Sequence, residues 1–259
     1  MTDPGKFVSY ASNFEDILLR RVFSQVQHGF YIDIGADHPV IASTTKAFYD
    51  RGWSGINVEP GPRWNLLDAE RPRDINLNIA VTDLDGEVDF FLNEGLSSIS
   101  SIFPEMNDLV RERTNRRIRY RVPALTLNTV VSRYAKERHV HFLKIDAEGA
   151  EERIITSTDW SAIRPVVLVV ESTEPFTTKR IDKSWNDLLR TNGYAEAYFD
   201  GVNTWFVRNE NAELLDHFKT PVNVLDNFTI FDPKRGRGIL DKLRRSLART
   251  FGKFLGLGK

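Results

Sequence analysis

Short apolar segments alternate with amphipathic segments along most of this chain. Strand-sized runs rich in branched aliphatic residues occupy residues 30–34, 55–58, 140–145 and 166–170. Between and around them, apolar residues recur at helical spacing. We expect helices at residues 14–26, 62–70, 126–136, 149–157 and 184–191, and another that follows residues 30–34 and runs to about residue 50. Strands that alternate with helices predict a mostly parallel sheet covered on both faces.

Three further strands are expected beside this pattern. Residues 75–81 are expected to form a strand, and the alternating segment 86–92 is expected to pair with it across the Asp85–Gly86 turn. Residues 119–124 resemble another strand. The polar segment 93–117 is expected to be a loop that covers part of the molecule.

The last part of the predicted sheet is a hairpin. Residues 194–199 and 204–207 flank a turn, so the sheet is expected to end in an antiparallel last strand.

Ser12 or Asn13 is expected to cap the first helix. The sequence therefore divides into an N-terminal helical segment, an α/β domain and a basic tail, at residues 1–28, 29–231 and 232–259.

Composition narrows the class of protein. The 259-residue chain has a formal net charge of −1, which does not favour nucleic acid as a partner. It contains no cysteine, which excludes disulfides, thiolate metal sites and thiol nucleophiles. No signal peptide is visible, and no apolar run is long enough to span a bilayer. We therefore expect a cytoplasmic protein.

Acidic residues follow four of the predicted strands. Any one of them can simply be a helix cap. Their recurrence on four strands is more informative, because ligands of open α/β sheets bind outside the carboxyl ends of the strands. The residues at these ends are Asp33, Gly35, Asp37, Glu59, Asp146, Glu148 and Glu171.

The glycine pattern narrows the ligand. Only Gly35 follows the first strand, whereas a dinucleotide site needs G-x-G-x-x-G, and no G-x-x-x-x-G-K-[ST] loop is present. A rim of carboxylates suits a nucleoside that has a positive centre and no phosphate, and S-adenosylmethionine fits this description. Glu59 stands where a carboxylate can bind a ribose diol. The alternative is an ordinary strand, turn and helix with solvated acids.

Several separated motifs support this interpretation. They are residues 9–16, 33–36, 51–60, 71–81, 95–98, 144–151 and 169–171. These segments resemble the FkbM family of S-adenosylmethionine-dependent methyltransferases, in family order, and the resemblance covers residues 9–227. It implies a Rossmann-like class I methyltransferase sheet and methyl transfer to oxygen, commonly to a hydroxyl of a sugar, glycan or polyketide.

The resemblance also implies roles for residues around the cofactor. Glu59 would take the ribose hydroxyls, and Asn78 and Ala80 would border the adenine. The role of Asp37 stays open, because Asp37-His38-Pro39 differs from the Asn-x-Gly form of many members. The expected set for S-adenosylmethionine is Asp33, Gly35, Ala36, Asp37, Glu59, Asn78, Ala80, Ser97, Ser98 and Asp146.

A sugar hydroxyl needs a base or a metal before it attacks a methyl group. Asp146 is the first choice for the base or a metal ligand, and Glu171 is its expected partner. Asp146, Glu148 and Glu171 together are candidate oxygen ligands for a divalent cation, while Glu148 is equally explained by helix-start electrostatics. His38 is the alternative base, or a loop histidine with a local hydrogen bond.

The tail differs from the rest of the chain. Residues 234–259 combine many basic residues with apolar residues at helical spacing, which predicts a basic amphipathic C-terminal helix. Such a helix can lie on an anionic membrane surface, here the inner face of the cytoplasmic membrane, or dock on its own domain or a partner. The expected acceptor is a saccharide or lipid-linked glycan. The alternatives are a polyketide or other small metabolite, and a catalytically silent module that binds the cofactor or a glycan.

Overall fold

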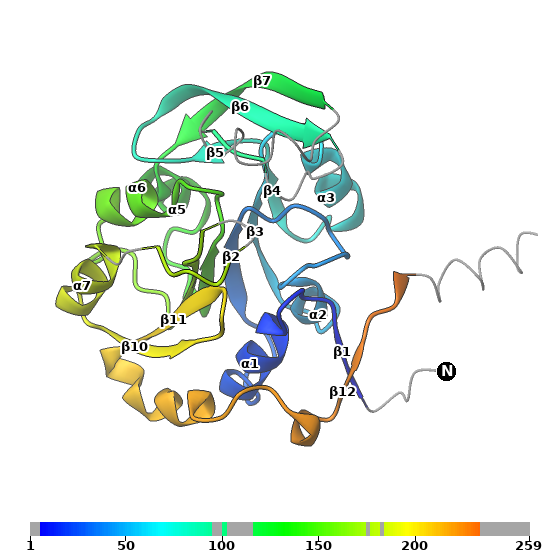
Figure 1. The fold of residues 1–259 in the computed structure, drawn as a ribbon, viewed down its shortest axis with the longest axis vertical. Helices are drawn as coiled ribbons and strands as arrows, with labels where there is room; N and C mark the ends of the chain where they lie inside the picture. Colours follow the sequence, from blue (N-terminus) through cyan, green and yellow to red (C-terminus); the bar gives the residue numbers. More distant parts are fainter. Residues whose placement is uncertain (1–5, 95–99, 103–115, 175–176, 182–183, 234–259) are drawn as a thin grey trace, which may run out of the picture.

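The computed structural model describes residues 6–94, 100–102, 116–174, 177–181 and 184–233 of the chain. A central sheet of seven strands dominates it (Figure 1), in the spatial order β10, β11, β9, β8, β2, β3 and β4. The bounds of its strands in chain order are β2 Phe30–Ile34, β3 Ser54–Val58, β4 Ile75–Leu77, β8 Phe142–Ile145, β9 Val167–Glu171, β10 Tyr194–Phe199 and β11 Asn203–Arg208.

The pairing of these strands confirms the predicted mostly parallel sheet. The strands β4, β3, β2, β8 and β9 pair in parallel, and β11 runs antiparallel to both β9 and β10. The chain builds β2, β3 and β4 toward one edge and then returns to place β8 and β9 on the other side of β2. The ends of β2 and β8 therefore form the switch point at which α/β sheets bind ligands.

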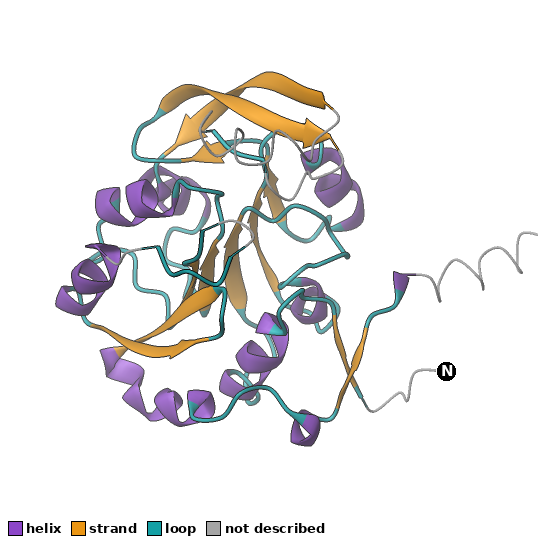
Figure 2. Cartoon of the chain, viewed as in Figure 1, coloured by secondary structure: helices purple, strands orange, loops and turns teal. Residues whose placement is uncertain are grey.

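Helices cover both faces of the sheet (Figure 2). On one face, α5, α6 and α7 pack against strand residues such as Ile32, Leu143 and Leu168. On the other, α1, α2 and the 3₁₀ segment η3 pack against Tyr31 and Phe142, because successive strand residues point to opposite faces. The helices span α1 Glu15–Val22, α2 Lys46–Tyr49, α3 Trp64–Glu70, α5 Leu127–Tyr134, α6 Glu151–Ser157, α7 Ser184–Thr191, η3 Asn209–Phe218 and η4 Val224–Asp226.

A second sheet corrects the prediction for residues 75–92. The expected strand 75–81 is divided between β4 of the central sheet and β5, Ala80–Val81. The strand β6, Gly86–Glu94, pairs with β7, Arg116–Leu125, over nine residue pairs rather than with residues 75–81. This long pairing places Phe90, Leu92 and Val122 in a separate apolar cluster, which the two-residue β5 alone cannot cover.

Two helix predictions were also too long. The helix α1 ends at Val22 rather than at Val26, and no side chain caps its start, so neither Ser12 nor Asn13 is the cap. In place of the expected helix from β2 to about residue 50, only α2 is helical. The backbone between β2 and α2 has positive φ at Asp37 and Ala42, and helical residues do not adopt positive φ.

The two ends of the described chain meet in a small parallel pair. The strand β1, Phe7–Ser9, pairs with β12, Phe228–Ile230, at the lower right of Figure 1. The predicted amphipathic helix in residues 234–259 lies outside the described residues, as does most of the segment 93–117. Among the helices described, none has the length and apolar character needed to cross a membrane.

Candidate active site

A cavity of about 380 Å³ lies at the carboxyl ends of β2, β3, β8 and β9. The start of α1, the strands β5 and β6 and residues 100–102 close its other sides. Within the described part of the chain, Lys144 is the only lysine or arginine that lines it, against seven carboxyl side chains. These are Glu15, Asp33, Asp37, Glu59, Asp146, Glu148 and Glu171.

The loops after β2 and β8 touch each other at the floor of this cavity. Gly35 has φ of +78°, and a Cβ atom there would lie 1.8 Å from the backbone oxygen of Asp146. The N–H of Asp146 donates in turn to the carbonyl of Ile34 at 3.1 Å. Only glycine fits such an approach, so Gly35 allows the acids of the two strand ends to share one site.

Lys144 stands between two of these acids. Its Nζ lies 2.8 Å from Asp146 Oδ2 and 3.6 Å from Asp33 Oδ1, and it donates to the carbonyl of Gly35 at 3.4 Å. Burial lowers the pKa of Lys144, but the charges of Asp146 and Asp33 outweigh this and raise it above its ordinary value. Burial raises the pKa of Asp33 against the opposing pull of Lys144. The ammonium group therefore stays charged and fixes both carboxylates.

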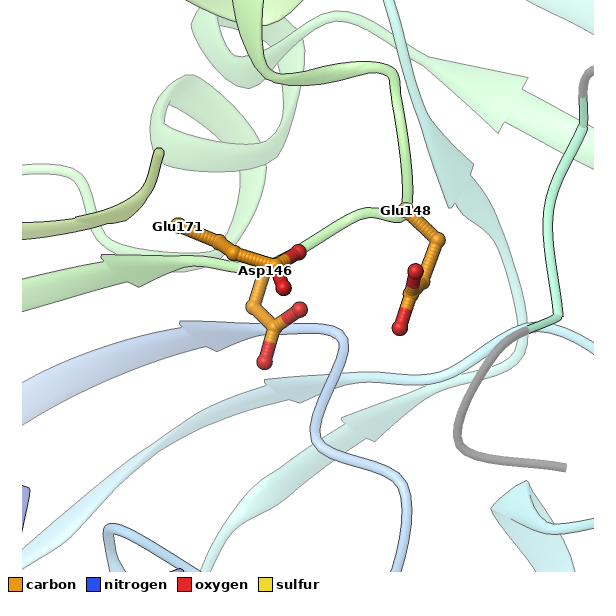
Figure 3. A group of neighbouring side chains, drawn as sticks. All are labelled: Asp146, Glu148 and Glu171. Carbon is orange, nitrogen blue, oxygen red and sulfur yellow. The ribbon is translucent and has the colours of Figure 1, made fainter. Parts of the chain in front are cut away.

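Three carboxyl groups, one of them the Lys144 partner Asp146, gather beside this corner. Ligand oxygens of Asp146, Glu148 and Glu171 lie within 4.8 Å of one another, and Figure 3 shows them converging from the ends of β8 and β9 and the loop before α6. Burial and the charge of Asp146 raise the pKa values of Glu148 and Glu171 well above the ordinary range. Such a group can hold a proton between carboxylates or bind a hard divalent cation.

Glu151 has a different role from its neighbour Glu148. Its two carboxylate oxygens accept the N–H groups of Ala147 at 2.6 Å and of Gly149 at 2.9 Å. These bonds hold the loop between β8 and α6, on which Glu148 takes a positive φ of 49°. Glu151 therefore positions the loop, and Glu148 lines the cavity.

The side of the cavity next to β3 is formed by Glu59. It is 6% exposed, and its Oε2 accepts the N–H of Asp37 at 2.9 Å. Burial raises the pKa of Glu59 to about 8. The Asp37 side chain turns to an ion pair with Arg63. Ala36 and Ala80 also line the cavity.

Some predicted site residues lie elsewhere. His38 is not among the described residues that line the cavity, and its Nδ1 accepts the N–H groups of Val40 and Ile41, both at 3.0 Å. Asn78 is exposed, and its Oδ1 accepts the N–H of Gly61 at 2.8 Å. Ser97 and Ser98 lie outside the described residues. The proposed roles of these four residues stay predictions.

Sequence reasoning gave no role to several residues that the structure places in the cavity. The sequence marked Lys144, since it is the one charged side chain in the otherwise apolar strand β8. Asn13 was expected only as a possible helix cap, and Glu15 belongs to a segment that was used to recognise the family. Asn203, which pairs with Glu171 across β11 and β9, had no signal of its own.

Comparison with protein families agrees with this geometry. Residues 33–199 match the family model of the methyltransferase FkbM domain, which is more than half of the chain. The chain belongs to the FkbM methyltransferase family. The FkbM match begins at Asp33, on the strand that opens the cavity, and includes Glu59, Lys144, Asp146 and Glu171. No curated protein matches the chain, and no solved structure matches it.

Proposed function

We propose that this FkbM methyltransferase uses S-adenosylmethionine to methylate a hydroxyl group of a saccharide, on a cell-surface glycan or its lipid-linked precursor. The observation that carries the proposal is the lining of the cavity, which among the described residues contains seven acidic residues and one lysine. Such a lining attracts a sulfonium and an ammonium group and repels phosphates.

The residues present fit the donor. Glu59 has a buried carboxyl group at the end of the strand next to β2, where a ribose diol is bound in related sheets. Ala80 and Phe90 offer an apolar wall for an adenine ring. Asp33, held by Lys144, supplies negative charge beside the glycine turn. S-adenosylmethionine, when bound, supplies a methyl group on a positively charged sulfur.

Asp146 and Glu171 are the residues that would act on the acceptor. A hydroxyl group must lose its proton as its oxygen attacks, and both carboxyl groups line the cavity. The raised pKa of Glu171 makes its carboxylate a stronger base than an exposed one. Lys144 keeps Asp146 oriented at 2.8 Å, and alignment of the acceptor oxygen accounts for much of the expected rate.

The test is mass spectrometry of surface glycans from cells with and without the protein. We expect one glycan to lose the mass of a methyl group when the protein is absent, and to regain it with the wild-type protein but not with Asp146→Asn. An unchanged glycan profile together with loss of methylation in a polyketide or small-metabolite fraction would move the proposal to that acceptor class. No change in any fraction contradicts methyl transfer to either class.

The divalent cation remains a separate prediction for Asp146, Glu148 and Glu171. If these carboxylates bind Mg²⁺ or Mn²⁺, titration of the protein with Mn²⁺ should show one bound ion by electron paramagnetic resonance, and Glu148→Gln should weaken it. If no ion binds, the three groups act by holding protons.

Binding of the full chain to anionic but not neutral vesicles would test the predicted role of residues 234–259.

A further inference from the structure

Apart from serine and threonine hydroxyls, the described lining of the cavity has few groups that can donate a hydrogen bond to a negative ligand group. The backbone N–H groups after β2, which often bind ligands in such sheets, are used within the protein. Those of Gly35 and Ala36 donate to the carbonyl of Val58 at 3.0 and 3.1 Å, and that of Asp37 donates to Glu59. The ammonium group of Lys144 is held by carboxylates and a carbonyl.

S-adenosylmethionine nevertheless carries one negative group, the carboxylate of its methionine part. Among seven carboxyl side chains, this group meets repulsion unless a donor faces it. A buried carboxylate without hydrogen bonds is costly. The proposed donor therefore requires at least one free N–H or O–H group in the lining of the cavity.

Asn13 has such a group. It lines the cavity, and its Nδ2 is buried with no hydrogen-bond partner among the described residues. Buried polar atoms are almost always partnered, so an unpaired amide at a cavity wall indicates that a ligand completes it. An amide N–H donor matches a carboxylate oxygen.

The backbone holds Asn13 in this position at a local cost. Phe14, the next residue, has φ of +61°, a conformation that is unfavourable for a bulky side chain. Its ring packs against that of Phe228, with centroids 5.4 Å apart, on the strand that pairs with β1. Strain of this kind often occurs at ligand sites, and here it lies between two residues that line the cavity.

Glu15 completes this corner. Its carboxylate accepts the N–H of Asn13 at 3.0 Å and the side-chain amide of Asn203 at 3.2 Å. It is 5% exposed and lies near enough to Lys144 for their charges to interact. A carboxylate next to a free amide donor is a matched pair for an ammonium and a carboxylate on one carbon atom.

We propose that Asn13 binds the α-carboxylate of the methionine part of the methyl donor through its side-chain amide, next to Glu15. The proposal rests on the proposed use of S-adenosylmethionine. It makes the segment before α1 the part of the chain that distinguishes a complete donor from one without the carboxylate.

The test compares two ligands by titration calorimetry of the full chain. One is S-adenosylmethionine, and the other is decarboxylated S-adenosylmethionine, in which hydrogen replaces the carboxylate. We expect Asn13→Ala to lower the affinity for S-adenosylmethionine by about tenfold to a hundredfold, as for a lost hydrogen bond to a charged group. The affinity for the decarboxylated ligand should stay within about twofold of the wild-type value. Asn65→Ala, at an exposed asparagine outside the cavity, is the matched control and should change neither.

Asn13→Asp sharpens the test, because it keeps the size of the side chain and reverses its role. Asn13→Asp should lower the affinity for S-adenosylmethionine more than Asn13→Ala does. The decarboxylated ligand should bind Asn13→Asp at least as tightly as it binds the wild type. Equal effects on both ligands, or no effect on either, overturn the proposal for Asn13 while wild-type binding keeps the proposed donor. If the wild type binds neither ligand, the proposed donor itself fails. Circular dichroism checks that each variant is folded.

Discussion

Two buried polar clusters lie on either side of Asp33, and they differ in how fully their groups are paired. The first, called here the Arg71 cluster, consists of Tyr31, Thr45, Arg71 and Asp74. The guanidinium group of Arg71 donates to Asp74 at 3.1 Å, Tyr31 at 3.0 Å and Thr45 at 2.8 Å, and also to a backbone carbonyl. Arg71 is fully buried, so this cation and its partners satisfy one another inside the protein.

The second cluster is the lining of the cavity, and it is not balanced. Lys144 pairs with Asp33 and Asp146, but Glu59, Glu148 and Glu171 have no cation of their own among the described lining residues. Burial therefore raises the pKa of each. Both clusters are polar and enclosed, yet only the second has carboxyl groups left without a cation among the described lining residues. These unpaired carboxyl groups, rather than polarity or burial alone, are what indicates a ligand.

The largest effect on stability is expected in the Arg71 cluster. Arg71→Met removes the cation and leaves Asp74 buried without it, which should lower the free energy of unfolding by about 3–5 kcal/mol. Urea denaturation measures this change, with Arg73→Met, at an exposed arginine, as the control. A loss below about 1 kcal/mol in the free energy of unfolding would show that the Arg71 cluster does not stabilise the fold.

In the cavity the same kind of change should affect activity instead. Asp146→Asn is expected to slow methyl transfer by about a hundredfold or more. Its side chain is 33% exposed, so the free energy of unfolding should change by about 1 kcal/mol or less. Transfer of radioactive methyl groups to glycans extracted from cells without the protein measures the rate. A normal rate would remove Asp146 from the mechanism.

A smaller effect is expected where the two loops touch. Gly35→Ala places a Cβ atom 1.8 Å from the oxygen of Asp146 and also requires φ of +78°, so we expect a loss of about 2–3 kcal/mol in stability. Gly201→Ala is the matched control, since φ there is +100° but no atom lies within 4 Å. Equal losses in thermal or urea unfolding would mean that the contact between the loops contributes nothing.

The smallest effect concerns pH. Burial raises the pKa of Glu15 to about 7 and that of Glu59 to about 8, so both groups are neutral at pH 6 and gain negative charge as the pH rises. Affinity for S-adenosylmethionine should then rise by about fivefold between pH 6 and pH 8.5. The affinity for S-adenosylhomocysteine, which lacks the positive sulfur, should change less over the same pH range. Identical pH profiles for the two ligands would argue against an electrostatic role for these acids.

Much of the central fold follows from local sequence patterns. The strands β2, β3, β8 and β9 are mostly apolar segments, so their positions were predictable. The strand order of an α/β sheet brings Asp33, Glu59, Asp146 and Glu171 to one edge. The second sheet was not predictable in the same way. Its pairing depends on contacts between β6 and β7, which are separated by more than twenty residues along the chain.

The sequence also did not predict every residue of the cavity. Lys144 and Asn13 have no spacing that marks them as cavity residues, because one reaches the cavity from within a strand and the other from before α1. Phe14, which has a left-handed backbone, packs its ring against that of Phe228, more than two hundred residues away. Such positions follow from tertiary packing, which propensity and periodicity do not contain.

Titration calorimetry of the full chain with S-adenosylmethionine is the most direct test of the account. If the unbalanced acids at the strand ends form a site for a cationic nucleoside, one molecule should bind per chain, S-adenosylhomocysteine should displace it, and ATP should neither bind nor compete. If S-adenosylmethionine produces no heat and does not raise the unfolding temperature, the cavity is not a methyl-donor site.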